Sequence, residues 1–479
     1  MAKTNVVRRL PIARDLTFQD VARLGEARAR CRRHFDLHGY AEIDTPLLEQ
    51  TELFLRKSGG ELASRLYSFM DPGGYQVSLR PEFTAPVIRH VIEEVGTRGL
   101  PLRYHYSGPV FRYPSPGTPA AGDPGVFTQA GAELIGGAAP EGDGEVIALA
   151  WSGLEVLGVP SPVVSIGHVG LLWGLLQPYG LSDRAQLFLV QSVGRLRGGD
   201  QVKKEVRDQA SAIGLFRNGD GRAAGVQGRE GPVDVSVEIV ESLLSRTIGG
   251  PIGPVSGART AEEIMARLAR KLQTVDDEKT LGAALDFISA LAVVKGPVEQ
   301  ALERGRKAAR AAGQGDTPFA ALEAVVESAV DRGIPSDAIT VDLGLARDIA
   351  YYTGSVFDLG SADNGSSFGG GGRYDGLMNS LGAGADIPAT GFAYNLDAVV
   401  ASSTTIKAPG AALRVVVAPE SKAALRAATA HAQRLRKQGT VAVLAPAGSQ
   451  AELKRVAKAI GAREIVLVQP DGASRTVRP

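Results

Sequence analysis

Residues 79–133 read, in order, LRPEFT (79–84), YHYSGPVFRY (104–113) and VFTQAGAE (126–133). The last two segments are rich in strand-forming residues, and a loop rich in Pro and Gly, residues 114–125, separates them. Because Pro and Gly cannot continue a β-ladder, the pattern predicts two antiparallel strands joined by a long loop. Side chains alternate along a strand, so Gln129, Gly131 and Glu133 would share one face. That face is a candidate binding surface for a small polar ligand.

A second dense stretch covers residues 340–400. It begins as a strand at VDL (341–343), continues with ARDIAYYTGSVF (346–357) and reaches the glycine-rich segment FGGGGRYDG (368–376). Glycine is needed where backbone must approach a ligand closely, because a side chain there would clash. As a generic phosphate loop the segment is a weak candidate, since it lacks the G-K-[ST] ending.

These segments lie in an order that resembles the class II aminoacyl-tRNA synthetases, and within them the histidyl branch. Residues 79–133 resemble the second motif of that family, and PATGFAYNLDA (388–398) resembles the third, a strand and helix that end the catalytic domain. A helix expected over residues 17–38, then a strand at 40–44 and Pro46, resembles the first motif, which builds the homodimer interface of the family. The resemblance implies an α+β fold, with a class II synthetase-like antiparallel sheet flanked by helices, and a homodimer.

The resemblance also implies a ligand, L-histidine, and the residues that bind it. In the family an Arg of the second motif grips the ATP α-phosphate, and Arg112 stands in its place. Glu82, Thr84 and Gln129 would surround the α-amino group of a bound histidine, and Glu133 would lie near its imidazole. This assignment is chemically reasonable, because an ammonium carries three donors and an imidazole N–H needs an acceptor.

Three further site residues come from the second stretch. In the histidyl branch an Arg there helps to hold the phosphate of the activated substrate, and Arg347 occupies its position. Tyr351 and Tyr352 correspond to a Tyr pair that closes on the imidazole. Taken alone, polar residues such as Gln129 and Glu133 more often decorate the face of a sheet than bind a ligand. The ordered set of motifs favours a binding site.

A chain of 479 residues is too long for one hydrophobic core, so several domains are expected. We expect four regions: a first half of the synthetase-like core (1–174), a mainly helical insertion (175–332), a second half with the histidine motifs and a degenerate third motif (333–401), and a basic α/β domain (412–479). The helical region is inferred from a capping box at residues 260–263 and from helical spacing of Leu281, Leu285 and Ile288.

The C-terminal region predicts three strands alternating with two helices: strands 413–418, 441–444 and 464–468, and helices 422–438 and 450–460. This order is typical of a parallel α/β layer. It resembles the anticodon-binding domain of the histidyl branch, truncated by a strand and a helix. Residues 411–479 carry twelve Lys/Arg and four Asp/Glu, a net charge of +8, so the rest of the chain carries −7 to give +1 overall. Solvated helix faces and attraction to RNA or an acidic partner explain this charge equally well.

Composition restricts the remaining possibilities. The single cysteine, Cys31, excludes an internal disulfide and a cysteine-based zinc site, and the six histidines form no H-E-x-x-H motif. Residues 1–15 lack the apolar core of a signal peptide, and no later run has the length of a membrane span. These features predict a cytoplasmic protein without membrane segment, metal or cofactor.

Three positions depart from the family in a way that concerns ATP. Ala398 stands where the third motif has an Arg for the γ-phosphate, Pro114 where the second motif has a Glu close to ATP, and Gly125 where a basic residue follows the loop. Residues 114–125 contain no Lys or Arg. Because cationic clamps on a triphosphate supply both binding and transition-state stabilisation, these departures predict that adenylation is lost.

A pocket that holds histidine without ATP suits a sensor. The chain therefore resembles a paralogous family, the regulatory subunits of ATP phosphoribosyltransferase, which pair with a short catalytic subunit in the first step of histidine biosynthesis. Ala350, which replaces an acidic residue usual in the synthetases, fits that resemblance. It implies a hetero-oligomer, histidine feedback control and no catalytic residues in this chain.

Two alternatives remain open. The extra basic domain favours a histidine–tRNA ligase that activates histidine with ATP, because the regulatory paralogues commonly end after the sheet domain. A free-standing RNA-binding module is less favoured, and tRNA binding is not expected, since residues 412–479 contain no Phe, Trp or Tyr on which bases could stack.

Overall fold

A computed structural model describes residues 7–10, 13–56, 59–94, 99–114, 125–217, 276–345, 347, 351–363, 365–407 and 414–479. The chain divides into two compact units. The main unit comprises Met1–Asp15 and Leu24–Ile406, and the second unit comprises Leu16–Arg23 and Lys407–Pro479.

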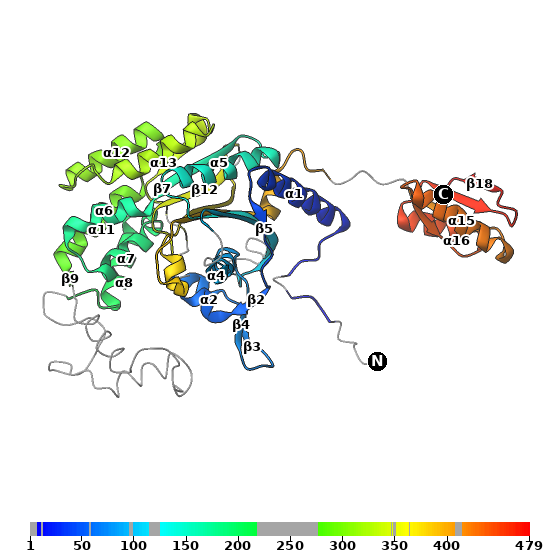
Figure 1. Ribbon diagram of the computed structural model, residues 1–479, viewed down its shortest axis with the longest axis horizontal. Coiled ribbons are helices and arrows are strands. Elements are labelled where there is room, and N and C mark those ends of the chain that lie inside the picture. The colour runs from blue at the N-terminus through cyan, green and yellow to red at the C-terminus, as the bar shows by residue number, and fades with distance from the viewer. Residues whose placement is uncertain are drawn as a thin grey trace. The chain divides into compact units, whose positions relative to one another are not determined.

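A nine-stranded sheet organises the main unit, in the order β1-β5-β6-β14-β13-β12-β7-β11-β10 (Figure 1). Its strands are β1 (Ala41–Glu42), β5 (Leu102–Phe111), β6 (Val126–Ile135), β7 (Pro162–His168), β10 (Lys295–Pro297), β11 (Ile339–Asp342), β12 (Ser355–Ser361), β13 (Ser367–Arg373) and β14 (Ala389–Asn395). From β5 to β7 every neighbouring pair is antiparallel, whereas β1 pairs with β5 and β11 with β7 in parallel. The expected α+β fold with a mainly antiparallel sheet is confirmed.

The strand pair predicted from residues 104–133 is β5 and β6. Phe111 pairs with Val126 at the loop end, and Leu102 pairs with Ile135 at the other end. Most of the predicted loop, residues 115–124, lies outside the described residues. The prediction succeeded because runs of strand-forming residues on both sides of a loop rich in Pro and Gly carry a local signal.

The two faces of β6 serve different cores. Ala130, Ala132 and Leu134 pack in the larger hydrophobic core, which also holds the buried face of α5 (Glu141–Val156). Gln129 and Glu133 point to the opposite face, where the smaller core of Phe83 and α4 (Thr84–Glu94) lies. Figure 1 shows α5, α12 (Val298–Ala311) and α13 (Phe319–Asp331) on one side of the sheet and α4 on the other.

Among the described residues between β7 and β11, most lie in helices. These helices are α6 (Val169–Leu176), α7 (Asp183–Ser192), α8 (Asp200–Ala212), α11 (Glu278–Ala292), α12 (Val298–Ala311) and α13 (Phe319–Asp331). Leu281, Leu285 and Ile288 are buried on one face of α11, which confirms their helical spacing. The predicted capping box at 260–263 lies outside the described residues. The region also supplies β10, the edge strand of the main sheet, which the sequence did not reveal.

The remaining helices and strands of the main unit lie mostly near the start of the chain. The helices are α1 (Phe18–Leu37), α2 (Thr51–Leu55), α3 (Gly59–Ser64) and α4 (Thr84–Glu94), and α14 (Leu396–Ser402) follows β14. β2 (Leu48–Gln50), β3 (Ser68–Met70) and β4 (Gln76–Leu79) form a three-stranded sheet, and β8 (Phe216–Arg217) pairs with β9 (Asp276–Asp277). The expected helix at 17–38 and strand at 40–44 correspond to α1 and the shorter β1.

The second unit contains a four-stranded sheet in the order β16-β15-β17-β18. Its elements are β15 (Arg414–Pro419), α15 (Leu425–Lys437), β16 (Val441–Leu444), α16 (Gln450–Ile460), β17 (Glu464–Val468) and β18 (Ser474–Val477). β15, β16 and β17 are parallel, as predicted, but β18 is antiparallel and was missed. Its residues are polar and mostly exposed, so no buried alternation marks it, although the Asp471-Gly472 turn is a hairpin signal.

Close backbone packing at β13 gives a prediction about stability. A Cβ on Gly371 would lie 1.9 Å from the carbonyl oxygen of Gly391, whereas a Cβ on Gly282 in α11 would meet nothing within 4 Å. We expect Gly371→Ala to destabilise the protein by about 1–3 kcal/mol or more through overpacking. Gly282→Ala should be neutral or stabilising by up to about 1 kcal/mol, because Ala favours helix. Thermal unfolding measures both, and equal melting temperatures would contradict the packing of β13 against β14.

Candidate functional site

The carboxyl group of Glu133 lies at the centre of the candidate site and is fully buried. Its Oε1 accepts hydrogen bonds from Thr84 Oγ1 at 2.7 Å and from the Tyr106 hydroxyl at 2.9 Å. Its Oε2 accepts a hydrogen bond from the Tyr374 hydroxyl. These donors come from the start of α4, from β5 and from the residue after β13, so the sheet brings three distant segments to one carboxyl group.

Burial decides the protonation of this group. It raises the pKa of Glu133 to about 7, although the three hydroxyl donors favour the charged form and oppose this rise. The nearby Glu82 carboxyl raises the pKa further. A carboxylate has about four lone-pair positions. The three hydroxyl donors leave one of them, on Oε2, for an additional donor.

Glu82 is also buried, and it caps the first turn of α4. Its carboxylate accepts hydrogen bonds from the backbone N–H groups of Thr84 at 2.5 Å and Ala85 at 3.1 Å. Burial raises the pKa of Glu82, whereas these backbone bonds and the Arg112 guanidinium act to lower it. Arg112 donates from Nε to the carbonyl oxygen of Pro81 at 2.8 Å. The two charged side chains therefore lie close together beside the entrance of α4.

Gln129 shares the face of β6 with Glu133, as predicted. Its side chain is 7% exposed, and among the described residues no donor satisfies its Oε1. A buried carbonyl oxygen without a partner is costly unless a ligand or water supplies the missing hydrogen bond. Gln129 thus marks a position where a ligand or a water molecule can donate a hydrogen bond.

The tyrosine pair closes the other side of the site. The rings of Tyr351 and Tyr352 lie 5.1 Å apart, and the rings of Tyr351 and Tyr374 lie 5.6 Å apart. Tyr351 also interacts with the Thr84 side chain. Arg347 forms an ion pair with Asp358 on β12. Ala350 lies outside the described residues.

Glycines make room for these side chains. A Cβ on Gly391 would lie 1.6 Å from Oε2 of Glu133, and a Cβ on Gly372 would lie 2.9 Å from the Tyr352 ring. The sequence predicted a close approach at the glycine-rich segment, and the structure shows that side chains of the site make it.

The structure brings together seven of the predicted residues: Glu82, Thr84, Arg112, Glu133, Arg347, Tyr351 and Tyr352. Gln129 lies on the same face of β6 as Glu133, four positions away. Sequence reasoning missed Tyr106 and Tyr374, the two phenols that bind Glu133. Tyr106 lay within the quoted strand, and its register opposite Gly131 on β6 could have placed it on the site face.

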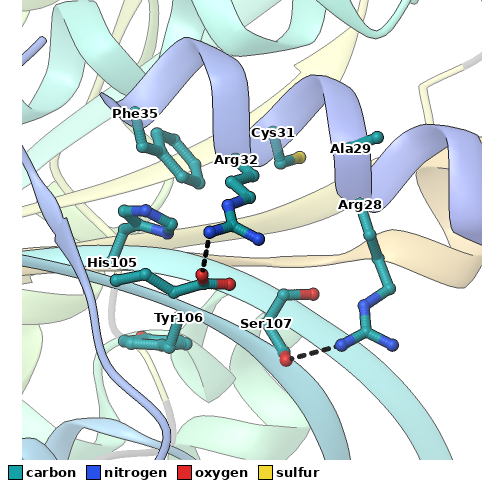
Figure 2. Close-up of a pocket in the computed structure, with 9 residues that line it drawn as sticks. Arg28, Ala29, Cys31, Arg32, Phe35, His105, Tyr106 and Ser107 are labelled. Carbon is teal, nitrogen blue, oxygen red and sulfur yellow. Dashed lines mark hydrogen bonds and ion pairs between the residues drawn. The ribbon is translucent and has the colours of Figure 1, made fainter. Parts of the chain in front are cut away.

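A separate cleft lies on the other face of β5 (Figure 2). It has a volume of about 210 Å³ and is lined by Arg28, Ala29, Cys31, Arg32, Phe35, Glu42, His105, Tyr106 and Ser107. Arg28 donates to the carbonyl oxygen of Ser107 at 3.1 Å, and Arg32 pairs with Glu42 at 2.9 Å. Its cationic side chains are thus already engaged within the chain.

The three positions that concern ATP have uncharged side chains. Ala398 lies in the first turn of α14, and its N–H donates to the side chain of Asn395 at 3.2 Å. The charged residue of that turn is Asp397, which accepts from the backbone N–H of Thr128 at 2.8 Å and pairs with Arg14. The start of α14 therefore presents a carboxylate.

The described residues contain neither a candidate metal site nor a candidate membrane span. No cluster of three or more His, Cys, Asp or Glu side chains suits a metal ion. None of the helices found there combines the length and the apolar character needed to cross a membrane.

Sequence comparisons identify relatives over most of the chain. A model of the histidyl-tRNA synthetase family matches residues 12–211 and 235–399. The histidine–tRNA ligase of Archaeoglobus fulgidus is 30% identical over 462 residues, covering 96% of this chain and 90% of that protein. The histidine–tRNA ligase of Methanocaldococcus jannaschii is 29% identical over 415 residues, covering 87% of this chain and 80% of that protein.

Solved structures agree on the fold. A Bacillus halodurans protein, named ATP phosphoribosyltransferase regulatory subunit/histidyl-tRNA synthetase, has a TM-score of 0.66 and 21% identity, covering 98% of this chain and 99% of that one. Apo histidyl-tRNA synthetase of Staphylococcus aureus has a TM-score of 0.57 and 19% identity, covering 99% of this chain and 97% of that one. These similarities concern the fold alone, and they confirm the expected class II synthetase-like architecture. With the family model matched over most of its length, the chain belongs to the histidyl-tRNA synthetase family.

Proposed function

We propose that this chain is a regulatory, non-catalytic subunit of an ATP phosphoribosyltransferase, which senses histidine through the site around Glu133. The observation that carries the proposal is the loss of positive charge where a synthetase of this family would hold the triphosphate. Ala398 and Gly125 stand where the family has basic residues, and the loop 114–125 has no Lys or Arg. A triphosphate without such clamps is neither bound well nor stabilised during adenylyl transfer.

The chemistry of the site suits histidine. The open lone-pair position on Oε2 of Glu133 would accept an imidazole N–H, with Tyr351 and Tyr352 beside it. Gln129, Glu82 and Thr84 would receive the α-ammonium group, which satisfies the buried Oε1 of Gln129. Arg112 and Arg347 would face the carboxylate end of the ligand.

The proposal includes partners. The catalytic residues would belong to a short-form ATP phosphoribosyltransferase subunit, and this chain would form a homodimer through α1 and β1. The name of the similar Bacillus halodurans structure supports this assignment, because it pairs the regulatory subunit with the synthetase fold.

A histidine–tRNA ligase is the second candidate. The relatives quoted above are histidine–tRNA ligases. The basic second unit suits a nucleic-acid partner, which a histidine sensor does not need. Adenylation separates the two candidates directly.

The first prediction concerns adenylation. We expect the purified chain not to catalyse histidine-dependent exchange between ATP and pyrophosphate, because uncharged side chains cannot neutralise the triphosphate. A known histidine–tRNA ligase serves as the positive control in the same assay. Exchange at a rate similar to that control would refute the regulatory proposal and favour the ligase.

The second prediction concerns the Glu133 carboxyl group. Glu133→Gln should weaken histidine binding about tenfold to a hundredfold, since it removes a charged acceptor for the imidazole. Calorimetry measures the affinity, and Glu155→Gln, which changes an exposed carboxylate on α5, is the matched control. Wild-type protein that binds no histidine would rule out the site.

The same variant tests the protonation of Glu133 without ligand. Burial raises its folded pKa to about 7, so the folded state binds this proton more tightly than the unfolded state does. This contribution to stability is complete below about pH 4.5, the unfolded value, and is lost as the pH rises through 7. The melting temperature of Glu133→Gln relative to the wild type should therefore increase between pH 5 and pH 8. A constant difference would show that Glu133 does not titrate in this range.

The third prediction concerns the partner. Histidine can regulate a complex only if it binds differently to its active and inhibited states. We expect this chain to co-elute with a short catalytic subunit of ATP phosphoribosyltransferase, to raise its turnover and to make that turnover sensitive to histidine. Tyr352→Ala and Glu133→Gln should relieve the inhibition. A mixture that neither co-elutes nor changes rate would refute the partner, and inhibition that survives both substitutions would place the histidine site elsewhere.

A further inference from the structure

Arg80 is almost fully buried, with 2% of its side chain exposed, and it binds mainly backbone carbonyl groups. Its Nε donates to Pro109 O at 3.0 Å, and its Nη1 donates to Thr45 O at 2.6 Å. Its ion-pair partner, Asp44, lies 3.3 Å away with a side chain that is 87% exposed. Removing a guanidinium from water without a buried counter-ion costs free energy. The position of the Arg80 guanidinium therefore calls for an explanation other than charge pairing.

That placement begins a stack of planar groups. The guanidinium of Arg80 lies 3.9 Å above the centre of the Phe83 ring. The Phe83 ring lies 4.3 Å from the Tyr106 ring, and the two rings are nearly parallel, at 7°. Gly108 leaves the space for this stack, because a Cβ there would lie 2.5 Å from Nη2 of Arg80 and 3.0 Å from Phe83.

The stack ends at the candidate site. Figure 2 shows Tyr106 directed away from the cleft beside α1, whereas its neighbour His105 faces α1. The Tyr106 hydroxyl donates to Oε1 of Glu133 at 2.9 Å, and it has a second acceptor, the carbonyl oxygen of Phe392, at 3.4 Å. A small tilt of the ring would therefore move this hydrogen bond from the carboxyl group to the backbone.

We propose that Arg80 and Phe83 are positioning residues: they hold the Tyr106 ring so that its hydroxyl donates to Oε1 of Glu133 and stabilises the carboxylate. Oε2, which already accepts from Tyr374, would use its remaining lone pair for the N–H of histidine. The role as a histidine site rests on the proposed function, whereas the control of the Glu133 carboxyl by the stack does not depend on it.

Loss of the stack has a specific electrostatic consequence. Each hydroxyl that donates to Glu133 stabilises its carboxylate form, so losing the Tyr106 donor raises the pH at which the carboxylate forms. Other groups also face this carboxyl group and influence its pKa. They are Glu82 and Thr84 at the start of α4, Tyr374 after β13, and Tyr351 and Tyr352.

The test compares Phe83→Leu, which keeps an apolar side chain but removes the stack, with Tyr106→Phe, which removes the hydroxyl itself. Phe287→Leu is the matched control, because Phe287 stacks on Tyr179 in the helical region, with ring centres 6.1 Å apart. L-Histidine affinity is measured by calorimetry from pH 6 to pH 9. The titration of Glu133 without ligand is measured by carboxyl-carbon NMR on protein labelled at the Glu side-chain carboxyl.

We expect Tyr106→Phe to weaken histidine binding about tenfold and Phe83→Leu about threefold to tenfold. Both should raise the titration midpoint of Glu133, and the double variant should be no weaker than Tyr106→Phe alone, since Phe83 acts through Tyr106. Arg80→Lys, which keeps the charge but loses the planar fork, should change binding in the same direction. Phe287→Leu should lower the melting temperature only.

Three results would overturn the positioning role. The first is that Phe83→Leu changes stability alone, as Phe287→Leu does. The second is that its effect on affinity adds to that of Tyr106→Phe, and the third is that the Glu133 midpoint stays unchanged. If the wild-type protein binds no histidine, the proposed function fails, yet the shift of the Glu133 midpoint in Phe83→Leu still decides the positioning role.

Discussion

A buried carboxyl group held by three hydroxyl groups is the interaction on which the rest of the main unit depends. Glu133 lies in the middle of the sheet, and its partners Thr84, Tyr106 and Tyr374 come from segments up to 241 positions away in the chain. No single element could provide this arrangement. The antiparallel order β5-β6-β14-β13 brings the ends of these segments to one face, and α4 closes it.

Close packing around this carboxyl group explains the unusual composition of the neighbouring strands. Gly391 lies directly opposite Glu133 in the register of β14 and β6, and any side chain there would occupy the place of Oε2. The glycines of β13 similarly admit the backbone of β12 and the Tyr352 ring. A site rich in aromatic and charged side chains thus requires strands with almost no side chains beside it.

Positive charge is distributed unevenly around the proposed site. Arg112 and Arg347 lie beside it, whereas Asp397 in the first turn of α14 is paired with Arg14, and Ala398 and Gly125 carry no charge. Under the proposed function, these two guanidinium groups would match the single carboxylate of a small zwitterion such as histidine.

The sequence by itself determined the elements whose signals are local. Strand-forming residues on both sides of the Pro/Gly-rich loop predicted β5 and β6, and helical spacing predicted α11. The substitution at Ala398 was visible without coordinates. Only the tertiary structure decided which side chains meet. The two phenols on Glu133, the stack of Arg80, Phe83 and Tyr106, and the strands β10 and β18 were not predicted. Such contacts join residues far apart in the chain, and neither periodicity nor composition records the register and close approach that create them.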